Sequence, residues 1–333
     1  MSDFGTIGGT TISAIVGASP WLSPRGAYLK LRGEAGPKPD NEAMARGRKF
    51  ETVIARIFQA NHPEYFVARD SDRTSEECDD AIERVQDAEL SYLTGSPDRV
   101  LFGADDTEDE FKILAGLEIK TTQAASRSQW GEYGTDKIPL VYLVQCNWYM
   151  GFYNVPKWEV AVMFFNPKIG PVGYAEYTIY RDEEIIEALR KAAVEFWEKH
   201  VVPGIPPEND TVDESVVEYV KNQYPADTAP EEAANEDEEK RVERYVRAKI
   251  ALSKATCEYD AAKLAVQEAI GERAGIISSF GKITWKKSKS RFVTDWKPIA
   301  VKLGASQELI DQHTKTVEGS RIFNDRNLKM EED

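Results

Sequence analysis

Two apolar runs, residues 99–102 and 111–119, flank an acidic break in the chain, and this alternation predicts a β-hairpin. The break reads G-A-D-D-T-E-D-E, and glycine and aspartate favour turns over strands. Glu118 and Lys120 are two residues apart in the second strand, so they project to the same face. Folding the hairpin brings Asp98, at the start of the first strand, back opposite Glu118. The pattern therefore predicts two carboxylates and one ammonium at one end of a sheet, which suits a divalent-metal site.

The surroundings of Glu118 strengthen this interpretation. An isolated Glu-x-Lys triplet is more often a surface ion pair than a functional site. Here Leu117 and Ile119 bracket Glu118, and a charge inside an apolar strand is costly unless it is paired or bound to a metal.

Hydrophobic spacing in the N-terminal part predicts three helices. A short one is expected within residues 10–16, ended by Gly17. The second is expected over residues 24–31, because proline is favoured at a first helical position. Residues 41–61 show the clearest helical period, and Glu51 lies beside their apolar face. This glutamate is either a solvated neighbour or a third carboxylate for the hairpin site, and the pattern alone favours the solvated neighbour.

The segment after the hairpin alternates between helices and strands. Residues 138–153 predict a buried helix, on which Gln145 and Tyr149 are four apart and share a face. The remaining predictions are a loop over residues 121–139, strands over 158–165 and 174–180, and a helix over 182–200.

A change of composition divides the chain into three predicted parts. Residues 1–202 form the first domain, and residues 203–239 form an acidic, proline-containing linker. Residues 240–333 form an accessory region, with a long charged helix over 240–270 and a hairpin over 280–293.

The predicted C-terminal hairpin is basic within an acidic chain. Its basic residues are Lys282, Lys286, Lys287, Lys289 and Arg291. Together with Trp285 and Phe292 they could contact a nucleic-acid backbone through charge and stacking. A solvated surface hairpin is the alternative, and the clustering of charge favours phosphate binding.

Composition narrows the class of protein. Three cysteines, Cys78, Cys146 and Cys257, lie far apart, which predicts a reducing cytoplasm and neither a disulfide framework nor a zinc ribbon. No secretory signal and no run of membrane-spanning length is visible. Zinc-hydrolase and ATP-binding motifs are also absent from the sequence. The net charge of −15 disfavours a DNA-coating protein, but it does not exclude a nuclease, because local basic patches matter more than the total.

Five segments, in order, resemble the PD-(D/E)xK nuclease superfamily, and within it the YqaJ-type viral recombinases, which include lambda exonuclease. They read I-S-A-I-V-G-A-S-P-W-L-S-P, N-E-A-M-A-R-G-R-K-F-E, G-S-P-D-R-V, L-E-I-K-T-T and Y-L-V-Q-C-N-W-Y-M. The resemblance covers about residues 5–200. It implies an α/β fold with a restriction-endonuclease-like core, in which helices flank a mixed central sheet. A small C-terminal helix–hairpin module would follow.

The resemblance assigns a metal site. It implies that Glu51, Asp98 and Glu118 hold one or two Mg²⁺ ions, with the carbonyl of Ile119 as a further ligand. Mn²⁺ is an acceptable substitute. Lys120 is expected to orient the attacking water and to help deprotonate it. The assignment reverses the interpretation of Glu51 that the pattern alone favours.

Other residues are assigned to the substrate. Gln145 and Tyr149 match the Q-x-x-x-Y signature of RecB-like members and are expected to position the DNA strand or the water. Ser13 and Arg25, in the opening segment, are expected to hold a 5′-terminal phosphate. An iron–sulfur cluster is not expected, because the related iron–sulfur nucleases need four cysteines.

The resemblance implies a Mg²⁺-dependent exonuclease that digests duplex DNA ends from 5′ to 3′ in phage-type recombination. The expected partner is a single-strand annealing protein, and a ring-shaped homo-oligomer would explain processivity. The host cytoplasm is the expected location. The alternatives are a RecB-like or structure-specific endonuclease, and a DNA-end-binding module that does not cut.

Overall fold

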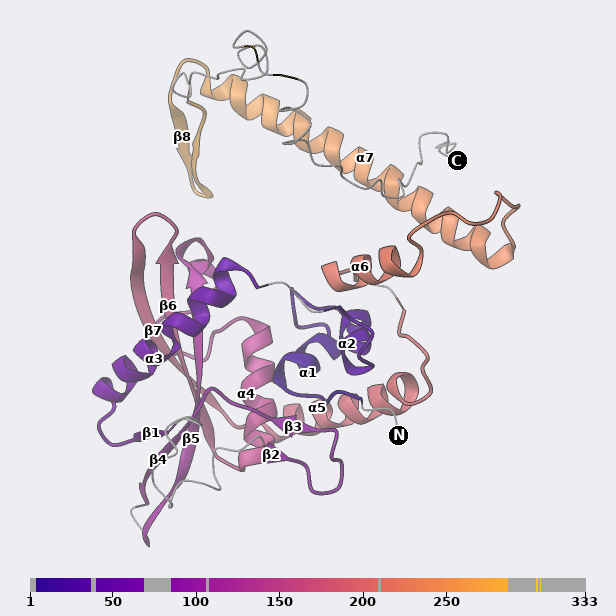
Figure 1. Cartoon of the computed structure of the whole chain (residues 1–333). Helices are drawn as coiled ribbons and strands as arrows, with labels where there is room; N and C mark the ends of the chain where they lie inside the picture. The colour runs from indigo at the N-terminus through magenta and orange to yellow at the C-terminus, as the bar shows by residue number, and fades with distance from the viewer. Residues whose placement is uncertain are drawn as a thin grey trace. The chain divides into compact units, whose positions relative to one another are not determined.

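The structure, a computed structural model, describes residues 4–36, 40–68, 85–105, 108–208, 211–286, 304 and 306. Contacts within the chain divide it into two units, Met1–Gln223 and Tyr224–Asp333 (Figure 1). Within the described ranges, no helix combines the length and the apolar character that a bilayer crossing requires.

The first unit is built on a five-stranded sheet with the order β1-β4-β5-β6-β7. Its strands are β1 (Phe66–Ala68), β4 (Arg99–Asp105), β5 (Glu108–Gln123), β6 (Lys157–Asn166) and β7 (Gly170–Tyr180). Strands β5 and β6 pair in parallel, whereas the other neighbours are antiparallel. The sheet is therefore mixed, and the predicted α/β fold class is confirmed. The predicted hairpin is β4–β5, with longer strands than the apolar runs indicated.

Helices cover both faces of this sheet (Figure 1). They are α1 (Gly9–Ile15), α2 (Pro24–Leu31), α3 (Glu42–Asn61), α4 (Leu140–Tyr153), α5 (Glu183–Phe196) and α6 (Glu214–Gln223). Helix α3 packs on one face, where Ile54 and Phe58 meet Leu117 of β5. Helices α1, α4 and α5 contribute to the larger core on the other face, around Trp158 of β6.

Local signals explain the helix ends that the sequence predicted. The Ser23 hydroxyl accepts the backbone N–H of Gly26 at 3.0 Å and caps α2. Asn41 caps α3 by accepting the N–H of Met44 at 2.9 Å. Gly17, just past α1, has φ +72°, a conformation that glycine adopts without a steric penalty.

Short elements complete the first unit. They are the strand pair β2 (Val85–Gln86) and β3 (Thr94–Gly95), the 3₁₀ helix η1 (Ala124–Gln129) and the π-helical turn η2 (Trp197–Val201). The expected loop over residues 121–139 is thus partly structured, because β5 continues to Gln123 and η1 follows at once. The predicted helix over residues 182–200 is α5 with η2 as its continuation.

The second unit holds α7 (Glu236–Ile270) and a hairpin of β8 (Gly275–Ser278) and β9 (Gly281–Thr284). The predicted hairpin position was wrong, because Phe280, expected to start it, lies in the turn. Lys282 lies in β9 and Lys286 follows it. Three residues of the predicted basic cluster lie outside the described residues: Lys287, Lys289 and Arg291.

The segment predicted as a linker is partly helical. It contains α6, and α7 begins within it at Glu236. The acidic run favours this helix start, because negative charges in a first turn interact well with the helix dipole. Asn235 and Glu238 also form a capping box there. The domain limits at residues 202 and 239 stay a prediction.

Candidate active site

The end of the β4–β5 hairpin brings Asp98 to the backbone of β5. The last paired residues of the ladder are Arg99 and Leu117, so Asp98 lies just outside it. The Asp98 Oδ2 atom accepts the N–H of Ile119 at 2.8 Å. Since the N–H and C=O of one strand residue point toward the same neighbouring strand, the Ile119 carbonyl faces the same edge as Asp98.

Glu118 and Lys120 project together from β5, as the period-two pattern predicted. Glu118 is 3% exposed, and the Lys120 ammonium donates to its Oε1 atom. The Lys120 Nζ atom lies 5.1 Å from the centre of the Tyr142 ring, where a cation–π interaction is favourable. The Glu118 Oε2 atom is buried and has no hydrogen-bond partner among the residues that the structure describes. The pair is therefore a buried charge pair with one unsatisfied acceptor.

The acidic side chains influence one another electrostatically. The pKa of Glu118 is raised to about 7, mainly by burial. The charges of Asp98 and Glu51 also raise it, and Lys120 lowers it. Burial lowers the pKa of Lys120, but the carboxylates of Glu118 and Asp98 outweigh this effect and raise it. Lys120 is thus an ammonium in the resting site. A bound cation would relieve the repulsion among the three carboxylates.

Glu51 is held by a residue that the sequence analysis did not single out. The Arg99 Nη1 atom donates to Glu51 Oε1 at 2.7 Å and also to the backbone carbonyl of Asp98. Arg99 is 4% exposed and is paired with Leu117, so both side chains lie on the α3 face of the sheet. A signal for Arg99 was present, because an arginine at the start of an apolar strand needs a buried partner.

The site therefore spans both faces of the sheet. Glu51 approaches from α3 on one face, and Glu118 and Lys120 project to the other. Asp98 lies at the strand end, where the two faces meet.

The oxygen atoms of this site are suitable ligands for a hard divalent cation, although the side chains do not form a ready ligand set. Carboxylates and a backbone carbonyl are typical ligands of Mg²⁺, and the unsatisfied Oε2 atom of Glu118 is a buried acceptor of this kind. In the described part of the chain, no group of three or more Asp, Glu, His or Cys side chains forms a ready ligand set. Glu51 is paired with Arg99 and Glu118 with Lys120 instead.

Helix α4 places Gln145 and Tyr149 on the Glu118 side of the sheet. Both are buried, and the Gln145 Oε1 atom has no partner among the described residues. Burial raises the pKa of Tyr149, and the charges of Glu118 and Asp98 raise it further. The Tyr149 hydroxyl oxygen lies where a side chain at Gly9 would come within 2.5 Å of it. The glycine at the start of α1 thus makes room for the hydroxyl.

The structure does not bring Ser13 and Arg25 into this site. Ser13 is fully buried, and its hydroxyl hydrogen-bonds to the carbonyls of Gly9 at 2.7 Å and Val141 at 3.2 Å. These contacts tie α1 to α4, so Ser13 does not face a surface that a DNA phosphate can reach, and its predicted role is corrected. Arg25 donates to the carbonyl of Pro207 at 3.1 Å.

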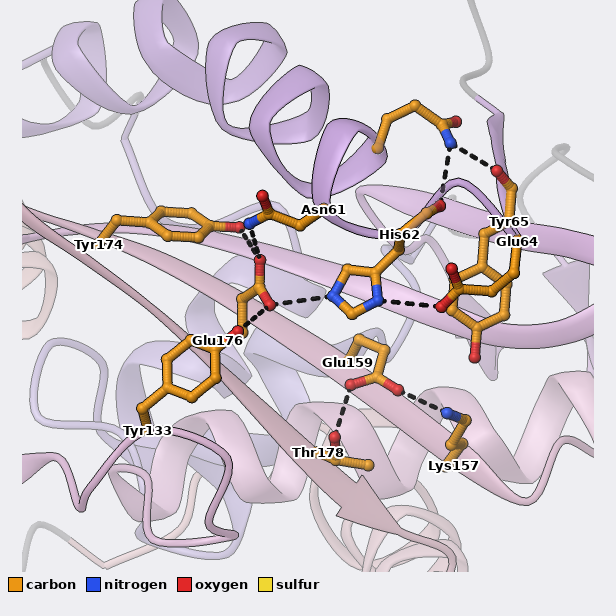
Figure 2. A network of polar contacts seen from close by, with 11 residues as sticks. Asn61, His62, Glu64, Tyr65, Tyr133, Lys157, Glu159, Tyr174, Glu176 and Thr178 are labelled. Atoms are coloured by element: carbon orange, nitrogen blue, oxygen red, sulfur yellow. Dashed lines mark hydrogen bonds and ion pairs between the residues drawn. The ribbon is translucent and has the colours of Figure 1, made fainter.

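A second polar cluster surrounds Glu176 on β7, beneath the end of α3 (Figure 2). Glu176 is 5% exposed. Its carboxylate contacts Tyr133 and Tyr174 at 2.6 Å, and Asn61 and His62 at 2.9 Å. The other ring nitrogen of His62 lies 3.1 Å from Glu64. Because the buried carboxylate is fully hydrogen-bonded, we interpret the cluster as a structural clamp between α3 and β7.

Comparison with known proteins shows which domain the N-terminal part of the chain resembles. Residues 4–153 match the YqaJ-like viral recombinase domain, and this range contains the predicted site residues from Ser13 to Tyr149. This segment of the chain is therefore similar to the YqaJ-like viral recombinase domain, and the resemblance expected from the sequence is confirmed. One relative is the uncharacterized protein YqaJ of Bacillus subtilis (strain 168), which is 27% identical over 219 residues. The match covers 66% of this chain and 60% of that protein.

Solved structures with a similar arrangement include two exonucleases. The alkaline exonuclease LHK-Exo of Laribacter hongkongensis is 13% identical with a TM-score of 0.42, over 66% of this chain and 94% of that one. A phage-related exonuclease of Haemophilus somnus 129PT is 13% identical with a TM-score of 0.40, over 59% and 95% of the two chains. Likeness at this level carries no inference about catalysis.

Proposed function

We propose that this chain is a Mg²⁺-dependent DNA exonuclease that hydrolyses phosphodiester bonds from duplex ends, 5′ to 3′, in phage-type homologous recombination. The observation that carries the proposal is the buried Glu118 carboxylate, with an unsatisfied oxygen, Lys120 beside it and Asp98 at the adjacent strand end. The match of residues 4–153 to the YqaJ-like viral recombinase domain supports the setting.

Phosphodiester hydrolysis needs a neutralised phosphate, an oriented water and a stabilised leaving oxygen. Glu51, Asp98, Glu118 and the Ile119 carbonyl would hold the metal, which supplies Lewis-acid stabilisation of the phosphate when bound. Lys120 acts as a hydrogen-bond donor and counter-charge. Because its pKa is raised, we do not assign it the role of a base in the resting site.

Residues on α4 complete the proposed site. The Gln145 amide and the Tyr149 hydroxyl lie on the Glu118 side of the sheet and would orient the DNA strand or the attacking water. Burial fixes both side chains, so they position a substrate with little loss of side-chain entropy. The proposed partners are duplex DNA ends and a single-strand annealing protein, and a ring-shaped homo-oligomer would account for processive digestion.

Digestion of linear duplex DNA with Mg²⁺ tests this function. Strands labelled at the 5′ end are compared with strands labelled internally, and closed circles are digested in parallel. The wild type should release label from 5′ ends and spare circles, and Glu118→Gln should be inactive. Glu195→Gln is a matched control, because the ion pairs of Glu195 in the described part of the chain are surface pairs with Lys199 and Lys191.

Other outcomes would reject the proposal in distinct ways. Cutting of closed circles would indicate an endonuclease. Binding to duplex ends without cleavage by the wild type would indicate an end-binding module. Release of label from 3′ ends first would reverse the assigned direction.

A further inference from the structure

Arg99 lies in the proposed site but has no part in the proposed chemistry. Its guanidinium is almost wholly buried, and it contacts Glu51 Oε1 at 2.7 Å and the backbone carbonyl of Asp98. One side chain thus joins α3 to Asp98, the residue just before β4. An arginine remains charged at any ordinary pH, so this positive charge is a fixed part of the site.

The charges of the resting site nearly balance without a metal ion. Three carboxylates, of Glu51, Asp98 and Glu118, face two cations, Lys120 and Arg99. Lys120 forms an ion pair with Glu118 on one face of the sheet, and Arg99 forms an ion pair with Glu51 on the other. A divalent cation bound at Glu51 would therefore meet a carboxylate that already has a counter-ion.

We propose that Arg99 is the resident counter-cation of Glu51 and competes with a metal ion for this carboxylate. It holds α3 against β4 in the metal-free protein and lowers the affinity of the Glu51 side for a divalent cation. This inference rests on the proposed metal site.

Two single substitutions separate competition from a purely structural role. Arg99→Gln removes the competing charge, and a unit charge within a few ångströms of a divalent ion changes its affinity strongly. We expect Mn²⁺ to bind at least tenfold more tightly to this variant than to the wild type. Glu51→Gln removes a ligand and leaves the Arg99 charge beside the site, so we expect binding at least tenfold weaker. If Arg99 only oriented Glu51, Arg99→Gln would weaken binding instead.

A double variant tests the competition even if Arg99→Gln folds poorly. Arg99→Gln combined with Glu51→Gln removes both charges of the pair, so no unpaired charge is left buried. Competition implies that the Glu51–Arg99 pair, whose charges cancel, adds little to metal affinity in the wild type. We therefore expect the double variant to bind Mn²⁺ within about threefold of the wild type, in a cycle with the single variants.

The experiment is a calorimetric titration of Mn²⁺ alone into the full chain after removal of metals, with thermal melts of each variant. Arg99→Lys should bind as the wild type does, because it retains the charge. Arg190→Gln is the matched control, since Arg190 pairs with Asp87 outside the site.

The possible failures can be told apart. Unchanged or weaker binding by Arg99→Gln, or a double variant as weak as Glu51→Gln, would overturn the competition. Absence of Mn²⁺ binding by the wild type and every variant would instead overturn the metal site of the proposed function.

Discussion

The Asp98 carboxylate accepts a hydrogen bond from the backbone N–H of Ile119, with 2.8 Å between Oδ2 and N. The contact extends the β4–β5 ladder by one side chain beyond its last paired residues. It fixes a carboxylate at the edge toward which the Ile119 carbonyl also points. Asp98 thus has a structural contact, which needs only an oxygen, and a proposed metal-binding role, which needs the negative charge.

Asp98→Asn should separate these two roles. Asparagine keeps an oxygen that can accept the Ile119 N–H, so the free energy of unfolding should change by no more than about 1 kcal/mol. Loss of the charge should lower cleavage of linear duplex by at least about 100-fold, because metal binding and charge stabilisation are both weakened. Urea unfolding and digestion of end-labelled DNA measure the two effects.

Asp182→Asn is the matched control for this prediction. Asp182 caps α5 by accepting the N–H of Ile185 at 3.1 Å, and asparagine caps helices equally well. The control should fold and cut as the wild type does. Full cleavage by Asp98→Asn would contradict the assignment of Asp98 as a metal ligand.

Lys120→Ala should abolish cleavage and largely spare DNA binding. The ammonium is the counter-charge of buried Glu118, and its loss removes a donor close to the proposed reaction centre. We expect cleavage to fall by about 100-fold or more, with the affinity for a labelled duplex changed less than about threefold, since distributed phosphate contacts dominate binding. Fluorescence anisotropy measures the affinity, and cleavage by the variant at the wild-type rate would contradict the role of Lys120.

The sequence predicted the parts of the site that local periodicity determines. The period of two in β5 put Glu118 and Lys120 on one face, and the helical period of α4 did the same for Gln145 and Tyr149. The hairpin turn then brought Asp98 to β5. These relationships depend on neighbours within a short stretch of chain, which is why pattern and turn chemistry were enough.

Tertiary partners were not predictable in this way. The pairing of Arg99 with Glu51 joins residues 48 apart in sequence, and no local pattern shows which charge an inward-pointing arginine will meet. Ser13 looked like a candidate phosphate ligand, but its hydroxyl donates to the carbonyls of Gly9 in α1 and Val141 in α4. The hairpin was predicted too far toward the C-terminus, because Lys282 and Lys286 both follow its turn instead of flanking it.

The clamp around Glu176 predicts a pH-dependent stability. Burial lowers the pKa of His62, but its contacts with Glu176 and Glu64 outweigh burial and raise the pKa above the ordinary value of 6.5. The stabilisation is therefore fully present below that ordinary value and is lost as the pH rises through the raised pKa. Above it, the neutral ring can donate to only one of the two carboxylates.

His62→Gln should remove this dependence. We expect the wild type to exceed the variant in free energy of unfolding by on the order of 1 kcal/mol at pH 6, because hydrogen bonds between charged groups are the stronger ones. The difference should shrink toward pH 9, as measured by urea titrations at each pH. His200→Gln is the control, since His200 contacts the carbonyl of Ile205 rather than a carboxylate. A difference that is constant across this range would contradict the prediction.

Gly116→Ala should destabilise the sheet beneath the site. Gly116 of β5 lies against Trp158 of β6, and an added Cβ would be 2.0 Å from the Trp158 ring. Because Trp158 is fully buried, the ring cannot move away freely, and overpacking of this kind typically costs about 1–3 kcal/mol. Urea unfolding measures the loss. Gly173→Ala in β7 is the control, since its nearest contact would be an ordinary 3.6 Å from Phe164.

Strand β5 lies in the interior of the sheet, with β4 on one side and β6 on the other. Backbone amides in such a position exchange with solvent only through large openings, whereas edges and ends of the fold open at much lower free energy. The proposed catalytic pair on β5 is thus attached to the slowest-exchanging part of the domain. Local opening of the outer elements does not displace Glu118 and Lys120. We expect the geometry of this pair to be lost only when the whole domain unfolds.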